Sequence, residues 1–163
     1  MKFILTIVIS LLLTSASFGQ IKSVSLQASG LTCSMCSNSI NKALKTLDFV
    51  EKVNPNIKTS TFEITFKSNS NVDFDKLKNK VEDAGFFVSK FIATIQFNNV
   101  EVKSNSPVIV GDKAFKFINA DNTAVNGEKQ IRLLDKGFVS AKEYKKYNLE
   151  ASQGTQRIYH ATI

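Results

Sequence analysis

The two cysteines of this chain carry its most specific chemical signal. Cys33 and Cys36 are the only cysteines among 163 residues, and two residues separate them. One close pair cannot build the disulfide framework of a small secreted domain, so the pair is interpreted as a site. Two thiolates at this spacing can face one point, and a soft, low-coordinate ion such as copper(I) is satisfied by two sulfurs. The sequence therefore predicts a soft-metal site with Cys33 and Cys36 as ligands.

The residues after Cys36 predict the helix that positions the pair. Apolar side chains recur at helical spacing through a segment without proline or glycine, at Cys36, Ile40, Ala43, Leu44 and Leu47. Cys36 is expected in the first turn of this helix, and Cys33 in the loop before it. The helix amides there favour the thiolate form, which serves both metal ligation and nucleophilic attack. Thiol-disulfide exchange therefore stays open as an alternative use of the pair.

Few other side chains could complete a metal site. A structural zinc site needs about four ligands, and only His160, the single histidine, and scattered carboxylates remain for one. Copper(I) is therefore the first candidate and mercury(II) the second. His160 is expected as a strand histidine that is either hydrogen-bonded or exposed. Met35 is expected to face solvent or to fill a gap, with a thioether ligand as the alternative.

The segments around the cysteines predict the order β-α-β-β-α-β. Alternating apolar residues indicate strands at 22–28, 49–53 and 61–67, with a turn at Asn54-Pro55-Asn56. Asp73 is expected to cap a second helix that Gly85 ends. An aromatic and β-branched strand at 86–97 closes the unit. This order is that of a ferredoxin-like sandwich, an α+β fold.

The cysteine motif in this setting resembles a known family. Residues 30–36 read G-L-T-C-S-M-C between the first strand and the first helix. Over about residues 22–91 the chain is similar to the heavy-metal-associated (HMA) domain family, which includes copper chaperones, domains of copper-transporting P-type ATPases and periplasmic mercury-binding proteins. Their usual motif is G-M-T-C-x-x-C, and Leu31 keeps the apolar character of the methionine. The resemblance implies metal ligation by Cys33 and Cys36, a metal-transport or metal-handling partner, and Phe86 as the aromatic residue beside the metal loop.

Residues 98–163 are predicted to form a β-rich domain with one short helix. Turn signals at Asn98-Asn99, Gly111-Asp112 and Asn126-Gly127 separate short strands, and the last strand is expected at 156–163. Ser140 and Glu143 have the spacing of a capping box, which predicts a helix to about Tyr147. A small barrel or an extra sheet packed on the first domain would fit. The segment shows neither a familiar family pattern nor a catalytic motif, so no enzymatic activity is expected.

The amino terminus is expected to be an export signal. Lys2 precedes an apolar run at 3–13, which is shorter than the roughly 20 residues needed to span a bilayer. Ser17 and Gly19 suit a cleavage site before Gln20. The expected organisation is a signal peptide at 1–19, the HMA domain at 20–97 and the β-rich domain at 98–163. The mature protein would then be exported, to a bacterial periplasm, without stable membrane insertion.

The charge pattern does not resemble a nucleic-acid arm, and no nucleic-acid partner is expected. The net charge is +7, yet residues 20–91 and 92–163 each hold ten bases and seven acids, so neither half is a basic module. Lys142, Lys145 and Lys146 share the short helix, as a solvated face or a docking surface. The sequence thus predicts a carrier that hands over a soft metal ion. A thiol-disulfide oxidoreductase and a redox-active interaction module are the alternatives.

Overall fold

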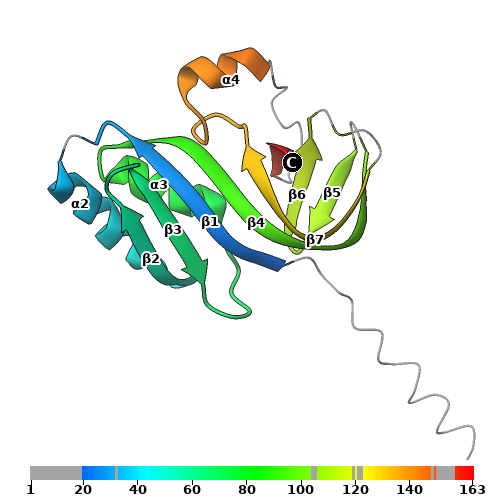
Figure 1. The fold of residues 1–163 in the computed structure, drawn as a ribbon, viewed down its shortest axis with the longest axis horizontal. Helices are drawn as coiled ribbons and strands as arrows, with labels where there is room; N and C mark the ends of the chain where they lie inside the picture. The colour runs from blue at the N-terminus through cyan, green and yellow to red at the C-terminus, as the bar shows by residue number, and fades with distance from the viewer. Residues whose placement is uncertain are drawn as a thin grey trace, which may run out of the picture.

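The computed structural model of this protein describes residues 20–31, 33–103, 106–118, 120, 123–147, 149 and 157–163. The predicted signal peptide at 1–19 lies outside these residues. The elements follow in the order β1 (Gln20–Ser29), α2 (Ser34–Lys45), β2 (Val50–Asn56), β3 (Thr61–Phe66), α3 (Phe74–Asp83), β4 (Phe87–Val102), β5 (Pro107–Val110), β6 (Lys113–Phe117), β7 (Thr123–Leu133), α4 (Ala141–Tyr147) and β8 (Ile158–Thr162) (Figure 1). The α+β class is as predicted.

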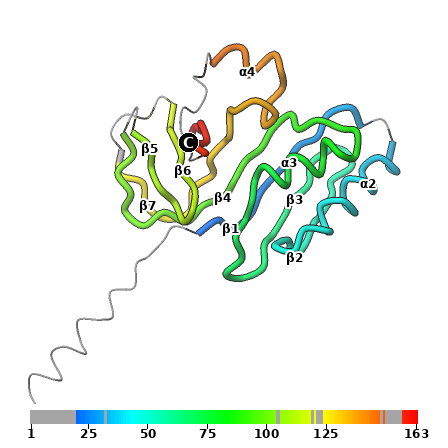
Figure 2. The backbone as a smooth tube through the Cα atoms, turned by 180° about the vertical axis from the view of Figure 1, so that it is seen from behind, coloured from blue at the N-terminus to red at the C-terminus, as the bar shows by residue number. Residues whose placement is uncertain are grey.

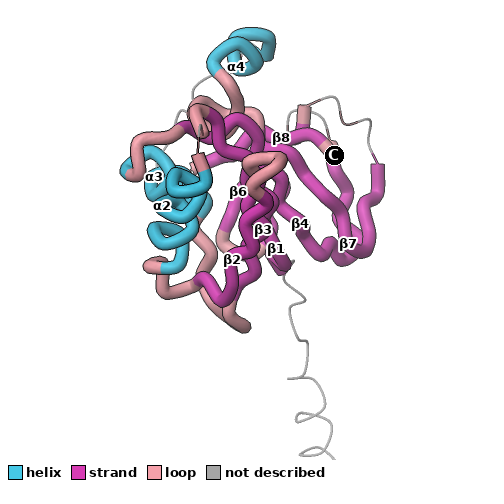
Figure 3. The backbone as a smooth tube through the Cα atoms, turned by 60° about the vertical axis from the view of Figure 1, so that its left-hand side comes forward, coloured by secondary structure: helices cyan, strands magenta, loops and turns pink. Residues whose placement is uncertain are grey.

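The first six elements form the predicted β-α-β-β-α-β unit. Its strands lie in the order β2-β3-β1-β4, and each neighbouring pair is antiparallel. Helices α2 and α3 lie side by side on one face of these strands (Figure 3). This is the arrangement of a ferredoxin-like sandwich.

Alternation in the strands and the stripes of the helices explain this packing. Strand β1 buries Val24, Leu26 and Ala28 on its helix-facing side, where α2 and α3 lie. The helices bury one stripe each, and β3 completes the layer, through Ile40, Leu44, Leu77, Val81, Phe62 and Ile64. The core that supports the cysteine loop is therefore built from the residues that the sequence pattern indicates.

Helix α3 begins and ends as predicted. The Asp73 side chain accepts a hydrogen bond of 2.9 Å from the backbone N–H of Lys76, which is the bond of an N-cap. Gly85 follows the helix with a φ of +88°, in the left-handed region that glycine adopts without steric cost. The chain can then reverse into β4, which places Phe86 near the end of β1.

The predicted turn at Asn54-Pro55-Asn56 is wrong. These residues belong to β2, where Pro55 pairs with Phe62 of β3, and the turn follows at residues 57–60. Strand β2 lies at the outside of the sheet, where a proline needs no partner for the backbone N–H that it lacks. The composition of these residues therefore predicted a turn, although they form part of an outer strand.

The predicted hairpin at Asn98-Asn99 is also wrong, because β4 runs through both residues. The register with β7 shifts between Phe97 and Val100, and Asn99 takes a positive φ of 49°. Its backbone N–H donates to Oδ1 of Asn126, at 3.3 Å. The turn signal at Asn126-Gly127 likewise lies inside β7. Both signals mark a bulge in a continuous strand pair, and β4 and β7 curve together in Figure 1.

The carboxy-terminal strands extend the same sheet. Its full order is β2-β3-β1-β4-β7-β8-β6-β5, so β4 pairs with β1 on one side and with β7 on the other. A sheet continuous with the first one replaces the separate barrel or packed sheet that the turn signals suggested. The predicted domain boundary after Phe97 falls inside β4, so the two halves share a strand there. Figure 2 shows the path of this strand from behind.

Aromatic side chains join the two halves. The ring centroid of Phe74, on α3, lies 5.1 Å from that of Phe91, 6.3 Å from Phe115 and 5.5 Å from Tyr159. Phe138 packs edge-on against Phe91, with 5.1 Å between the ring centroids. Buried residues from both halves belong to one hydrophobic cluster. Residues 98–163 therefore cover part of the core beneath α3.

Of the predicted capping box, the serine half forms at the start of α4, and the glutamate side chain binds elsewhere. The Ser140 hydroxyl oxygen accepts a hydrogen bond of 3.2 Å from the backbone N–H of Glu143, as predicted, whereas the Glu143 carboxylate pairs with Arg132 at 2.7 Å. The helix buries none of its residues. Among the described residues, the helices are all too short or too polar to span a bilayer.

Candidate metal centre

The two cysteines lie at the start of α2. Cys33 is the N-cap, with an extended backbone at φ −151° and ψ 160°, and its Sγ accepts a hydrogen bond of 3.3 Å from the backbone N–H of Cys36. Cys36 lies in the first turn, as predicted. Cys33 is exposed, Cys36 is half-buried, and no disulfide joins them. The geometry brings the pair to one end of the helix, with the Cys33 sulfur facing solvent.

The loop before Cys33 is held by a glycine and two apolar contacts. Gly30 ends β1 with a φ of +86°, a conformation that a side chain would strain. Leu31 packs partly buried against the core, in the role expected of the methionine in the family motif. A Cβ atom on Gly30 would lie 3.9 Å from Cδ1 of Phe86. Phe86 therefore lies against the first residue of the motif, beside the metal loop as expected.

The donor set at this end of α2 is soft and largely uncharged. The first charged residue after Cys33 is Lys42, in the last turns of α2. Within the described residues, histidine, cysteine and carboxylate side chains form no group of three that could hold a metal ion. Among the described residues, the thiol pair therefore has no third side chain of these types beside it, and it lies at the start of a helix. Such a pair suits a soft ion of low coordination number.

His160 is a hydrogen-bonded strand histidine, as predicted. It is buried on β8, where its Nδ1 lies 2.9 Å from Oδ1 of Asp135 and its backbone N–H donates to Oδ2 of the same carboxylate at 2.7 Å. Its role is to tie β8 to the loop after β7. Met35, by contrast, lies between the two cysteines with 79% of its surface exposed.

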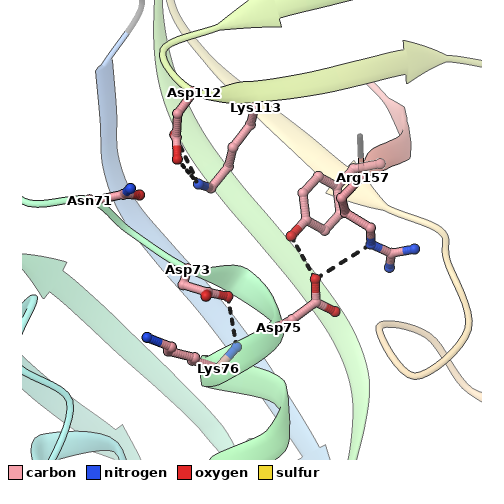
Figure 4. Close-up of a pocket in the computed structure, with 8 residues that line it drawn as sticks. Asn71, Asp73, Asp75, Lys76, Asp112, Lys113 and Arg157 are labelled. Carbon is pink, nitrogen blue, oxygen red and sulfur yellow. Dashed lines mark hydrogen bonds and ion pairs between the residues drawn. The ribbon is translucent and has the colours of Figure 1, made fainter. Parts of the chain in front are cut away.

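A polar cleft between the two halves has no counterpart in the sequence prediction. It encloses about 400 Å³ between the start of α3, the β5-β6 turn and β8 (Figure 4). The Tyr159 hydroxyl donates to Asp75 at 2.7 Å, and Arg157 Nε lies 3.4 Å from the same carboxylate oxygen. Burial, and then the hydrogen bond to Asp75, raise the pKa of Tyr159 above its usual value. These residues are far apart in the sequence, so no local pattern indicates the cleft.

Fold and thiol pair together define a class of protein, a ferredoxin-like domain with a CxxC pair between its first strand and first helix. A model of the heavy-metal-associated domain matches residues 25–87. The mercuric transport protein periplasmic component of Serratia marcescens is 34% identical over 65 residues, which cover 40% of this chain and 70% of that protein. The chain belongs to the heavy-metal-associated domain family.

Two further similarities cover a comparable share of this chain. A probable copper-exporting P-type ATPase of Archaeoglobus fulgidus is 38% identical over 63 residues, which are 39% of this chain and only 8% of the ATPase. The solved structure of oxidised MerP from Ralstonia metallidurans CH34 is 31% identical, with a TM-score of 0.39, over 44% of this chain and 94% of that one. The family assignment thus rests on the amino-terminal half and does not extend to residues 98–163.

Proposed function

We propose that this protein is an exported carrier that binds one copper(I) ion through Cys33 and Cys36 and hands it to another metal-handling protein. The observation that carries the proposal is the position of the pair, with Cys33 exposed as the N-cap of α2 and Cys36 in the first turn. Both sulfurs can reach one ion from this helix end. The ion is cargo rather than a resident cofactor.

Transfer requires that one ligand be accessible from solvent. A two-coordinate ion is transferred from one protein to another when an incoming thiolate binds it before a departing thiolate dissociates. Cys33 is exposed and lies at the loop, so a partner's sulfur can approach on its side, while half-buried Cys36 holds the ion. The helix start offsets the net negative charge of two thiolates around one monovalent cation.

The choice of copper(I) rests on the donors. Two thiolates without a third histidine, cysteine or carboxylate group among the described residues suit copper(I) and mercury(II) far better than zinc. Two relatives are named for copper export and for mercuric transport, which supports a soft ion. We take copper(I) as the cargo, and mercury(II) as the second candidate.

The alternative, a thiol-disulfide oxidoreductase, has less support. Such an enzyme benefits from a base or a cation beside its nucleophilic sulfur. Here His160 is bound to Asp135, and charged residues are absent from the first two turns of α2. The proposal that the protein is a carrier and not an enzyme follows from this uncharged setting. Export through residues 1–19 belongs to the same proposal.

Anaerobic titration of the reduced protein with copper(I) tests the function. We expect one ion per chain, and a loss of affinity by orders of magnitude in Cys33→Ser and Cys36→Ser, because one thiolate cannot replace two. Ser34→Ala, at an exposed position between the cysteines, is the matched control and should keep full affinity. Unchanged copper(I) binding in the double cysteine variant would place the site elsewhere.

A measured reduction potential separates the carrier from its rival. An oxidoreductase pair cycles between dithiol and disulfide by ready exchange with glutathione or a protein dithiol, whereas a carrier pair acts only as the dithiol and gains nothing from fast exchange. We expect slow exchange and tight copper(I) binding together. Rapid turnover of a disulfide substrate by the metal-free protein would favour the oxidoreductase instead.

A further inference from the structure

We propose that Met35 supplies a third, labile sulfur ligand to the copper(I) ion held by Cys33 and Cys36. The inference rests on the proposed function, since it takes the dithiolate site as given. Met35 lies in the first turn of α2, between the N-cap Cys33 and Cys36. It extends the site from two sulfur atoms to three.

The Met35 side chain is exposed, whereas its backbone belongs to a helix. Its peptide lies within α2, and its carbonyl oxygen accepts a hydrogen bond of 3.2 Å from the Ser39 hydroxyl. The side chain itself is 79% exposed and packs against no core cluster. Methionine is unbranched, with three rotatable bonds, so its sulfur can occupy several positions near the start of the helix. In the structure, this apolar side chain has no packing role that would explain its presence at the start of the helix.

No other soft donor is available close to the pair. The chain contains four sulfur atoms, those of Met1, Cys33, Met35 and Cys36, and three of them lie within four consecutive residues. The neighbouring side chains on α2 are serines and asparagines, whose hard oxygens suit copper(I) poorly. His160 is held by Asp135 in the other half. A third ligand of matching softness from the described residues is therefore Met35.

The ligand step is simple in atoms and electrons. A lone pair on Sδ of Met35 forms a dative bond to the ion, copper stays in the +1 state, and no proton leaves, because a thioether carries none. A thiolate is the stronger ligand for the same ion. An incoming thiolate from the partner therefore displaces Met35, which covers the ion only until transfer begins.

Selenium labelling tests this directly. The chain has two methionines, so the full chain grown with selenomethionine carries selenium at positions 1 and 35 only. We expect X-ray absorption at the selenium edge of the copper(I)-loaded protein to show copper as a near neighbour of part of the selenium. Met35→Leu, labelled in the same way, is the matched control, because it keeps an exposed apolar side chain and leaves selenium at position 1 alone. The copper neighbour should vanish in this variant.

The outcomes separate this inference from the function beneath it. Wild type and Met35→Leu should both bind one copper(I) per chain, since two thiolates remain. A loaded wild-type protein with copper-sulfur contacts and no copper near selenium overturns the role of Met35 and leaves the carrier intact. A wild-type protein that binds no copper(I) overturns the carrier, and the proposal for Met35 with it. A copper neighbour that persists in Met35→Leu would also contradict the proposal.

Discussion

The Tyr159 hydroxyl donates a hydrogen bond of 2.7 Å to Oδ2 of Asp75, and so joins the last strand to the first turn of α3 across 84 positions of sequence. Asp75 lies in the HMA half, and Tyr159 lies in the segment that the family does not cover. The same carboxylate faces Arg157 at 3.4 Å. One acidic residue of the metal-binding half is thus held by two residues of the other half.

Tyr159→Phe should destabilise the protein by about 1–2 kcal/mol, because a hydrogen bond to a charged acceptor is lost while the ring contacts remain. Chemical denaturation measures the change. Copper(I) stoichiometry should stay at one per chain, since the cysteines lie at the other end of the HMA half. A variant with the same free energy of unfolding as wild type would show that this hydrogen bond does not stabilise the contact between the two halves.

Alkaline pH should weaken the fold through the same residue. The pKa of Tyr159 is raised in the folded state by burial and by Asp75, so folding favours the neutral phenol. The stabilisation that the neutral Tyr159 hydroxyl contributes to folding is fully present below the unfolded-state pKa of about 10 and is lost as the pH rises above that value. Denaturation between pH 9 and about 11.5 should show a steeper decline for wild type than for Tyr159→Phe. Parallel declines would contradict the role of Tyr159.

Phe115→Ala should cost about 3–5 kcal/mol, the usual range for removal of a fully buried aromatic ring. Phe115 packs against Phe74 of α3, so the loss should appear in the unfolding of the HMA half as well. Circular dichroism and copper(I) release should report one shared transition. Ile109→Ala, at a position with 55% of its surface exposed, is the control and should change stability by less than about 0.5 kcal/mol.

Gly30→Ala should destabilise the protein by about 1–2 kcal/mol, the cost of a left-handed conformation for a residue with a side chain. The new Cβ finds ordinary contact distance to Phe86, so the cost comes from the backbone rather than from a clash. Thermal unfolding measures it, with Ser29→Ala as the neighbouring control. If the loop shifts to relieve the strain, copper(I) affinity should fall as well, because Gly30 begins the motif.

Oxidation and acid should each release the metal. A disulfide between Cys33 and Cys36 occupies both sulfurs, so the oxidised protein should bind essentially no copper(I), and bound metal should protect both thiols from alkylation. Protons compete for the same sulfurs, so affinity should fall with falling pH. Titration of the oxidised and reduced forms over a pH series checks both. Equal binding by the oxidised protein would overturn the dithiolate site.

Local patterns predicted the elements that local interactions determine. The cap at Asp73, the break at Gly85 and the start of α2 near Cys36 each depend on residues within one helical turn, and the structure confirms all three. The cysteine motif needed only its strand and helix to indicate a site. These features are visible without any knowledge of the tertiary fold.

The errors arose where distant contacts decide the outcome. Asn98-Asn99 has the composition of a hairpin, but pairing with β7 along the whole of β4 turns it into a bulge. Pro55 signals a loop, but its place on an outer strand removes the penalty. The bond between Tyr159 and Asp75 has no local signature at all. Each of these three features depends on how distant segments of the chain pack together, which a single sequence does not reveal.

The aromatic contact between the halves has an optical consequence. The chain has no tryptophan, and its three tyrosines, Tyr144, Tyr147 and Tyr159, all lie in the carboxy-terminal half. Tyrosine emission therefore originates entirely outside the metal-binding half. Because the Tyr159 ring packs 5.5 Å from Phe74 on α3, that emission nevertheless senses the integrity of the helix beside the one that bears the cysteine pair. The carboxy-terminal segment serves as a built-in fluorophore for a domain that has no tyrosine or tryptophan of its own.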